Sequence, residues 1–210
     1  MTDCNYQQTK RILLGQERMD DKYVQLADYI QKSFSVQVIN VTCTQRENTI
    51  NLTLWFKYEN EENMFYKEPF VVDSRKMNRI LRQFKRIMKL GNDSMNICLS
   101  FQAFETLAKV ETNNAVTQHE ILELKGKLRC NDIWVISRCL SNVVFFLYKD
   151  KQVSQYEERG YIDKWSEMYL GLLKRYDEFG FYTKENFHIK LDSKENFDNN
   201  FNGDWYYYYV

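Results

Sequence analysis

The chain has 210 residues, 29 basic and 29 acidic side chains that cancel to a net charge of zero, and a hydrophobic fraction of 44%. This length and composition exclude a disulfide-stapled miniprotein and a disordered tail, and the balanced charge excludes attraction of the whole surface to nucleic acid or to an anionic membrane. No apolar run reaches the roughly 18 residues of a membrane span, and the N-terminus lacks the apolar stretch of a signal peptide, so we expect a soluble cytoplasmic protein without a membrane partner.

Hydrophobic periodicity predicts a first α+β unit over residues 21–110, preceded by an N-terminal extension of residues 1–20. The expected elements are a helix over 21–33, a hairpin of two strands over 36–44 and 50–58, a helix over 75–90 and a strand over 95–101. The helix over 75–90 has the strongest signal, because apolar side chains recur on one of its faces and Gly91 and Asn92 follow as stop signals.

The same order of elements recurs in a second α+β unit over residues 117–210. Its expected elements are a helix over 118–128, strands over 133–138 and 143–148, a helix over 162–176 and a strand over 187–191. We therefore predict an internal duplication, although six short elements in a similar order also arise by chance. Each unit is expected to be a small antiparallel sheet with helices packed on one face.

No motif of a familiar enzyme or cofactor site occurs in the chain. The glycine-rich loops that hold nucleotide phosphates are absent, as are the zinc-protease, EF-hand and serine-hydrolase motifs. The five cysteines form no CxxC pair, so we expect buried free thiols in a reducing compartment rather than a disulfide framework or a zinc site. The sequence therefore predicts no enzymatic activity, no cofactor and no bound metal.

One predicted helix is strongly basic. Residues 75–89 contain seven cations and no acid. The residues that align on its polar face are Arg75, Arg79, Arg82, Arg86 and Lys89, and Lys76 and Lys85 flank the apolar stripe. Repulsion along this face disfavours the isolated helix slightly. The cations either pair with acidic segments of the same chain or stay solvated, or they bind an acidic protein or the phosphates of RNA or DNA.

The C-terminal residues 192–210 combine acids, amides and aromatic side chains. Four acidic residues stand against one lysine, and the segment ends in one tryptophan and four tyrosines. We expect a terminal strand with Trp205, Tyr207 and Tyr209 on one face and with Tyr206 and Tyr208 on the other. One face would join the core. The other would be either wetted by tyrosine hydroxyls or free to anchor a partner protein.

The segments Leu172–Asp177 and Phe187–Asp198, followed by Trp205–Tyr208, resemble the end of the small immunity proteins that bacteria pair with polymorphic toxins, in particular the YezG-like type. The order of helix, hairpin, long helix, strand and acid-rich aromatic end is also similar, with an echo at residues 84–100. This chain differs from that family in its neutral charge, its doubled order of elements and its basic helix. The resemblance implies a cytoplasmic bacterial antitoxin that neutralises its toxin by protein–protein interaction.

We therefore expect a non-enzymatic binding protein whose partner is a cognate toxin or effector. The expected partner-binding residues are Asp192, Glu195, Asp198, Asp204, Trp205, Tyr206 and Tyr208, and the acids among them would imitate phosphates if the toxin were a nuclease. One alternative is a nucleic-acid-binding or phage-related regulatory module that uses the basic helix. A second is a chaperone or adaptor that binds an unfolded segment of a secreted effector.

Overall fold

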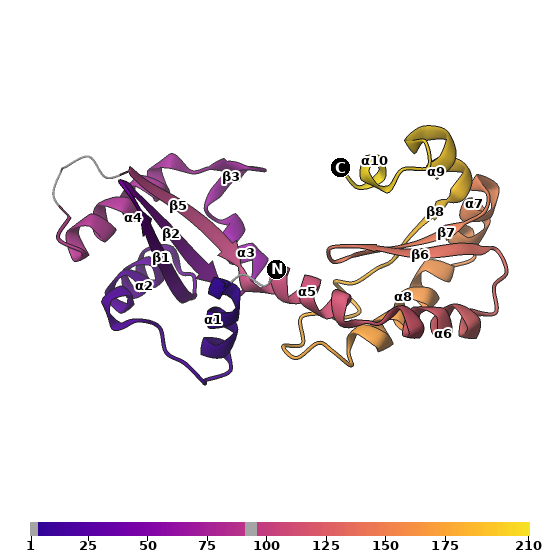
Figure 1. Cartoon of the computed structure of the whole chain (residues 1–210), viewed down its shortest axis with the longest axis horizontal. Helices are drawn as coiled ribbons and strands as arrows, with labels where there is room; N and C mark the ends of the chain where they lie inside the picture. The colour runs from indigo at the N-terminus through magenta and orange to yellow at the C-terminus, as the bar shows by residue number, and fades with distance from the viewer. Residues whose placement is uncertain (1–3, 91–95) are drawn as a thin grey trace. The chain divides into compact units, whose positions relative to one another are not determined.

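The computed structural model describes residues 4–90 and 96–210, which divide into two compact units, Met1–Leu107 and Ala108–Val210 (Figure 1). The predicted α+β class is confirmed. Unit boundaries differ from the prediction, because a helix before residue 21 folds onto the first unit. No helix in the two described stretches has both the length and the apolar content needed to cross a bilayer.

The first unit contains one main sheet, a short hairpin and several helices. Its elements are α1 (Cys4–Leu13), α2 (Asp21–Phe34), β1 (Val38–Arg46), β2 (Thr49–Phe56), α3 (Glu59–Asn63), β3 (Tyr66–Glu68), β4 (Val71–Val72), α4 (Ser74–Ile87) and β5 (Asn96–Ala103), and α5 (Phe104–Ala115) runs into the second unit. The predicted stop signals Gly91 and Asn92 and the predicted start of the strand at Met95 lie outside the described residues.

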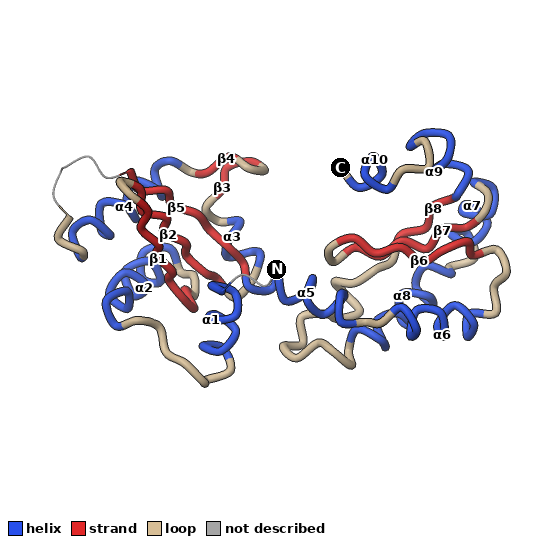
Figure 2. The backbone as a smooth tube through the Cα atoms, in the orientation of Figure 1, coloured by secondary structure: helices blue, strands red, loops and turns tan. Residues whose placement is uncertain are grey.

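The main sheet of the first unit has the strand order β1–β2–β5 (Figure 2). The β1–β2 hairpin is antiparallel as predicted, but β5 runs parallel to β2, so the prediction of a purely antiparallel sheet was wrong. The chain between β2 and β5 is long and contains α3 and α4, and a crossover of that kind brings the next strand back in the parallel direction.

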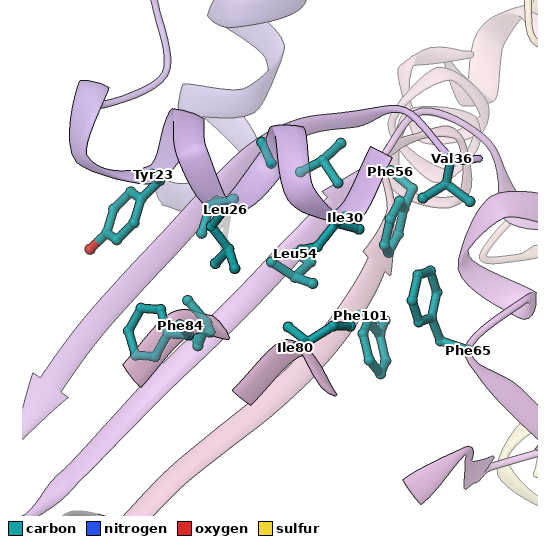
Figure 3. Packing of buried hydrophobic residues seen from close by; sticks show 14 of the residues in the cluster. Tyr23, Leu26, Ile30, Val36, Leu54, Phe56, Phe65, Ile80, Phe84 and Phe101 are labelled. Atoms are coloured by element: carbon teal, nitrogen blue, oxygen red, sulfur yellow. The ribbon is translucent and has the colours of Figure 1, made fainter. Parts of the chain in front are cut away.

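Helices cover both faces of this sheet, not one as predicted. On the first face, Leu26 and Ile30 of α2 and Ile80 and Phe84 of α4 pack against strand residues such as Leu54 (Figure 3). On the opposite face, α1 is held to β1, because the Asn40 side chain donates a hydrogen bond of 2.9 Å to the buried hydroxyl of Thr9. The residues predicted as an N-terminal extension therefore include a docked helix.

The second unit is built from α6 (Gln118–Leu128), β6 (Ile133–Cys139), β7 (Asn142–Leu147), α7 (Asp150–Glu158), α8 (Tyr161–Leu173), β8 (Lys190–Ser193), α9 (Lys194–Phe201) and α10 (Trp205–Tyr209). Its strand order is β6–β7–β8, with β7 antiparallel to β6 and parallel to β8. Here too, the crossover before the third strand is helical. Helices α6 and α8 cover one face of the sheet, and α9 and α10 cover the other (Figure 1).

The two sheets share details beyond strand order. In each hairpin the register shifts next to the first paired residue, between Val38 and Asn40 and between Ile133 and Val135. In each unit a helix follows the hairpin, and the backbone N–H of its first residue donates a 3.2 Å hydrogen bond to a glutamate side chain. In α3 this bond runs from Glu59 to Glu105, and in α7 it runs from Asp150 to Glu195. These shared details agree with a duplication, which stays a prediction.

Candidate partner-binding surfaces

Helix α4 turns its apolar stripe inward and its basic residues outward. The Asp73 carboxylate caps its first turn by accepting hydrogen bonds from the backbone N–H groups of Arg75 at 2.9 Å and Lys76 at 3.3 Å. These bonds hold the pKa of Asp73 below its usual range even though partial burial opposes that shift. Buried Ile80 and Phe84 fix the rotation of the helix, so its remaining sides face solvent.

The exposed basic residues of α4 and of the turn after it form a surface that we call the cationic face. Its members are Arg75, Arg79, Arg82, Lys85, Arg86 and Lys89. Lys89 follows the end of the helix with a φ of +51°. Lys76 is half-buried, and its ammonium donates to the Met64 carbonyl.

The cationic face is not neutralised by the rest of the described chain. No carboxylate in residues 4–90 or 96–210 comes within ion-pair distance of its six cations. Two members have local contacts: the Arg79 guanidinium lies 5.0 Å from the centre of the Phe34 ring, and Arg82 donates to the Asn78 carbonyl at 3.3 Å. Pairing with acids of the same chain, one of the two simple interpretations of this helix, is therefore not observed among these residues.

The C-terminal aromatic residues form a short helix, so the predicted terminal strand was wrong. Asp204 caps α10 by accepting a 2.8 Å hydrogen bond from the backbone N–H of Tyr206. The Trp205 ring packs on Phe197, with ring centres 4.3 Å apart, and stacks on Trp134 at 6.0 Å. Tyr208 joins the same cluster, whereas Tyr206 and Tyr207 point outward and are 67% and 59% exposed.

The acidic residues predicted to bind a partner all have partners within the second unit. Asp192 accepts hydrogen bonds from the Ser193 N–H, the Asn196 amide and the Tyr208 hydroxyl, the last at 2.6 Å. Glu195 accepts from the Asp150 N–H and lies 3.7 Å from the Lys149 ammonium. The third, Asp198, pairs with Lys194, and the fourth, Asp204, is the cap described above. These carboxylates therefore make hydrogen bonds and ion pairs within the second unit.

Tyr208 shows how tightly this cluster is built. Burial, together with the hydrogen bond that its hydroxyl donates to Asp192, raises the pKa of Tyr208 above its usual range. The hydroxyl therefore stays protonated at physiological pH and remains a donor. Of the predicted partner-binding residues, Tyr206 offers the most free surface, and Trp205, at 38% exposed, offers only part of its ring.

The cysteines and histidines bring together no catalytic group among the described residues. Cys4 and Cys98 are exposed and the other three cysteines are half-buried, so the prediction of buried thiols was wrong. His119 lies 3.2 Å from Glu123 on the surface of α6, and no histidine in residues 4–90 or 96–210 makes a hydrogen bond to a cysteine. No group of three potential metal ligands occurs in the part of the chain that the structure describes.

One exposed apolar feature was missed by sequence reasoning. The β3–β4 hairpin turns at Pro69 and Phe70, and the Phe70 side chain is 99% exposed with a φ of +66°. Met64 and Val71 nearby in sequence are 43% and 48% exposed. A proline followed by an apolar run, between the predicted strand over 50–58 and the predicted helix over 75–90, was the available signal, but the strands are too short to show an alternating pattern.

No family model, curated protein or solved structure matches this chain.

Proposed function

We propose that this chain is a non-enzymatic binding protein that captures an acidic protein, and that it acts as an immunity protein covering the active site of a cognate bacterial toxin. The observation that carries the proposal is the cationic face of α4, whose six exposed cations have no carboxylate partner among the described residues. A local excess of charge in a chain of zero net charge steers association with an oppositely charged surface.

The energetics of α4 support an acidic partner. Neighbouring cations three or four residues apart, such as Arg75 and Arg79 or Arg82 and Arg86, destabilise the helix by about 0.2–0.5 kcal/mol per pair. Arg75 and Lys76 also lie at the positive end of the helix dipole, where cations are disfavoured. An acidic surface across the cationic face relieves both penalties. Binding therefore recovers free energy that the isolated fold lacks.

A protein partner fits the first unit better than a nucleic acid does. The unit exposes the apolar Phe70, Val71 and Met64 in addition to its arginines. Aromatic and arginine side chains are enriched at the centres of protein interfaces. The four C-terminal acids Asp192, Glu195, Asp198 and Asp204 are engaged internally, so the proposal places the main contact on α4 and leaves Tyr206 and Tyr207 as a second candidate contact.

The test is coexpression with the product of the neighbouring gene in a heterologous bacterium. We expect that product alone to arrest growth and this chain to restore it by forming a complex. The triple variant R79E/R82E/R86E should lose the protection. The control variant K32E/K127E/K151E, which changes the net charge equally at exposed sites elsewhere, should keep it. Absence of growth arrest, or equal protection by both variants, contradicts the proposal.

A nucleic-acid-binding module is the second candidate, because exposed Asn78 lies among the arginines of α4 and because amide and guanidinium groups read base edges. This candidate predicts that the purified protein carries RNA or DNA that nuclease treatment removes. A chaperone for a secreted effector predicts binding to the unfolded form of the partner. An immunity protein instead binds the folded toxin, so circular dichroism of the partner in the complex separates the two.

A further inference from the structure

The cationic face borders a groove along one edge of the first sheet. The groove has a volume of about 470 Å³, is open to solvent, and is lined by Asn78, Leu81, Arg82, Lys85 and Ile97. The four α4 residues follow one another at helical spacing, so they form a single stripe along the helix. Ile97 belongs to β5, which is an edge strand in the order β1–β2–β5.

The edge of β5 has backbone groups directed away from the sheet. The Asn96 N–H donates toward β2, to the Asn48 carbonyl at 2.9 Å. Because N–H and C=O groups alternate sides along a strand, those of Ile97 and Leu99 point to the open edge. At the end of the strand, the outward N–H of Ala103 is satisfied by the Glu62 carboxylate at 2.7 Å. No described residue supplies a corresponding partner to Ile97 or Leu99.

We propose that the groove between α4 and the β5 edge binds an extended acidic segment of the partner protein, which adds to the sheet as a fourth strand beside β5. This proposal deepens the proposed function and rests on it for the identity of the partner. Outward backbone groups at Ile97 and Leu99 supply the hydrogen bonds of an added strand. The chemistry of the groove sets which side chains that strand carries.

Side chains alternate along a strand, so every second residue of the bound segment faces α4. Those residues meet the exposed cations Arg82 and Lys85 above a floor of half-buried Leu81 and Ile97. Acidic residues next to a small apolar one match this lining. The intervening residues lie beside Cys98 and Ser100, which are exposed on the other face of β5, and need only be small and polar.

The probe is a fluorescein-labelled heptapeptide in which glutamate, valine and glutamate alternate with threonine, added to the full-length protein. We expect saturable binding with a Kd below about 1 mM, and protection of the Ile97 and Leu99 amides from hydrogen exchange. A peptide with lysine in place of glutamate should not bind. A peptide N-methylated at alternate residues should bind about tenfold more weakly, because it lacks strand donors.

Charge-reversed proteins test the lining. The variant R82E/K85E should weaken peptide binding about tenfold or more, whereas K127E/K151E, with the same change in net charge, should stay within about threefold of the wild type. Equal binding of the N-methylated peptide overturns the added strand. Equal binding by R82E/K85E overturns the acidic occupant. If the protein forms a dimer in solution, protects its β5 amides and does not bind the peptide, the groove is an interface with a second copy. If it binds an oligothymidylate and not the peptide, the groove is a nucleic-acid site. Either result overturns the proposal.

This experiment separates the groove from the proposed function. If the peptide fails to bind while toxin capture still depends on Arg79, Arg82 and Arg86, the groove assignment fails and the proposed function stands. If the peptide binds and the neighbouring gene product is not captured, the groove stands as a peptide site and the immunity function fails.

Discussion

The turn at Phe70 makes an unusual prediction, because removing its side chain should stabilise the protein. Pro69 and Phe70 are the two central residues of the β3–β4 turn, and a positive φ at the second of them, +66° here, is favoured by glycine. A non-glycine residue in this region costs about 1–2 kcal/mol. The ring is 99% exposed, so almost no packing is lost when it is removed. The greater freedom of glycine in the unfolded chain offsets roughly half of the gain.

We therefore expect Phe70→Gly to raise the free energy of unfolding of the first unit by about 0.5–1 kcal/mol. Phe70→Ala keeps the positive φ and removes the ring, so it should change stability by less than about 0.5 kcal/mol. Hydrogen exchange of the most protected amides of β1 and β2 reports the stability of this unit separately from the other. A loss of more than about 1 kcal/mol in Phe70→Ala, or no gain of Phe70→Gly over Phe70→Ala, would refute this reasoning.

Two further predictions concern the second unit. Trp205→Ala should lower its free energy of unfolding by about 3 kcal/mol, because the ring packs on Phe197 and Trp134. Tyr206→Ser, at an exposed position, should change that free energy by less than about 0.5 kcal/mol. Urea unfolding measures both, and equal effects of the two substitutions would contradict the packing of Trp205. Hydrogen bonds from the Thr117 N–H and hydroxyl, together with Tyr176 and Arg175, hold the pKa of Glu120 below its usual 4.5. The charged form of Glu120 therefore stabilises the fold above about pH 4.5, and this contribution is lost as the pH falls through the lowered pKa. The Tm difference between the wild type and Glu120→Gln should be largest near neutral pH and should shrink below about pH 4. A Tm difference that does not depend on pH would contradict this role of the Glu120 carboxylate.

The sequence predicted the elements with strong periodicity and missed those set by tertiary packing. Helix α4 and the β1–β2 hairpin follow from side-chain spacing alone, within a few residues of their observed ends. The parallel direction of β5 does not appear in its hydrophobic pattern, which is the same for either direction. The long helical connection before it was the usable signal, since antiparallel neighbours need only a short turn.

The C-terminal aromatic segment shows a different reason for error. Consecutive tyrosines favour a strand by propensity, but Asp204 caps a helix there and Trp205 finds Phe197 and Trp134 to pack on. Those rings are distant in sequence or belong to another element, so the local pattern does not reveal them. The same holds for the acids: only the folded chain shows that Asp192 is bonded to Tyr208.

The candidate site was partly predictable. Periodicity placed five of the cations on one face of α4, and the structure adds Lys85 to that exposed set. Only the fold shows that no carboxylate in residues 4–90 and 96–210 lies within ion-pair distance of them, because the acidic segments that could pair with them are far away in sequence. The groove beside β5 could not be predicted from the sequence either, since Ile97 and Leu81 come together only through the crossover between β2 and β5.

The central claim is that the cationic face of α4 binds the partner. Its most direct test is the association rate constant of the purified neighbouring gene product with the wild type and with R79E/R82E/R86E, measured by stopped flow at low and at high salt. The account predicts that the wild-type rate falls about tenfold or more as salt is raised, and that the triple variant associates slowly at both salt concentrations. Equal rates for the two proteins, or a wild-type rate that does not depend on salt, would contradict it.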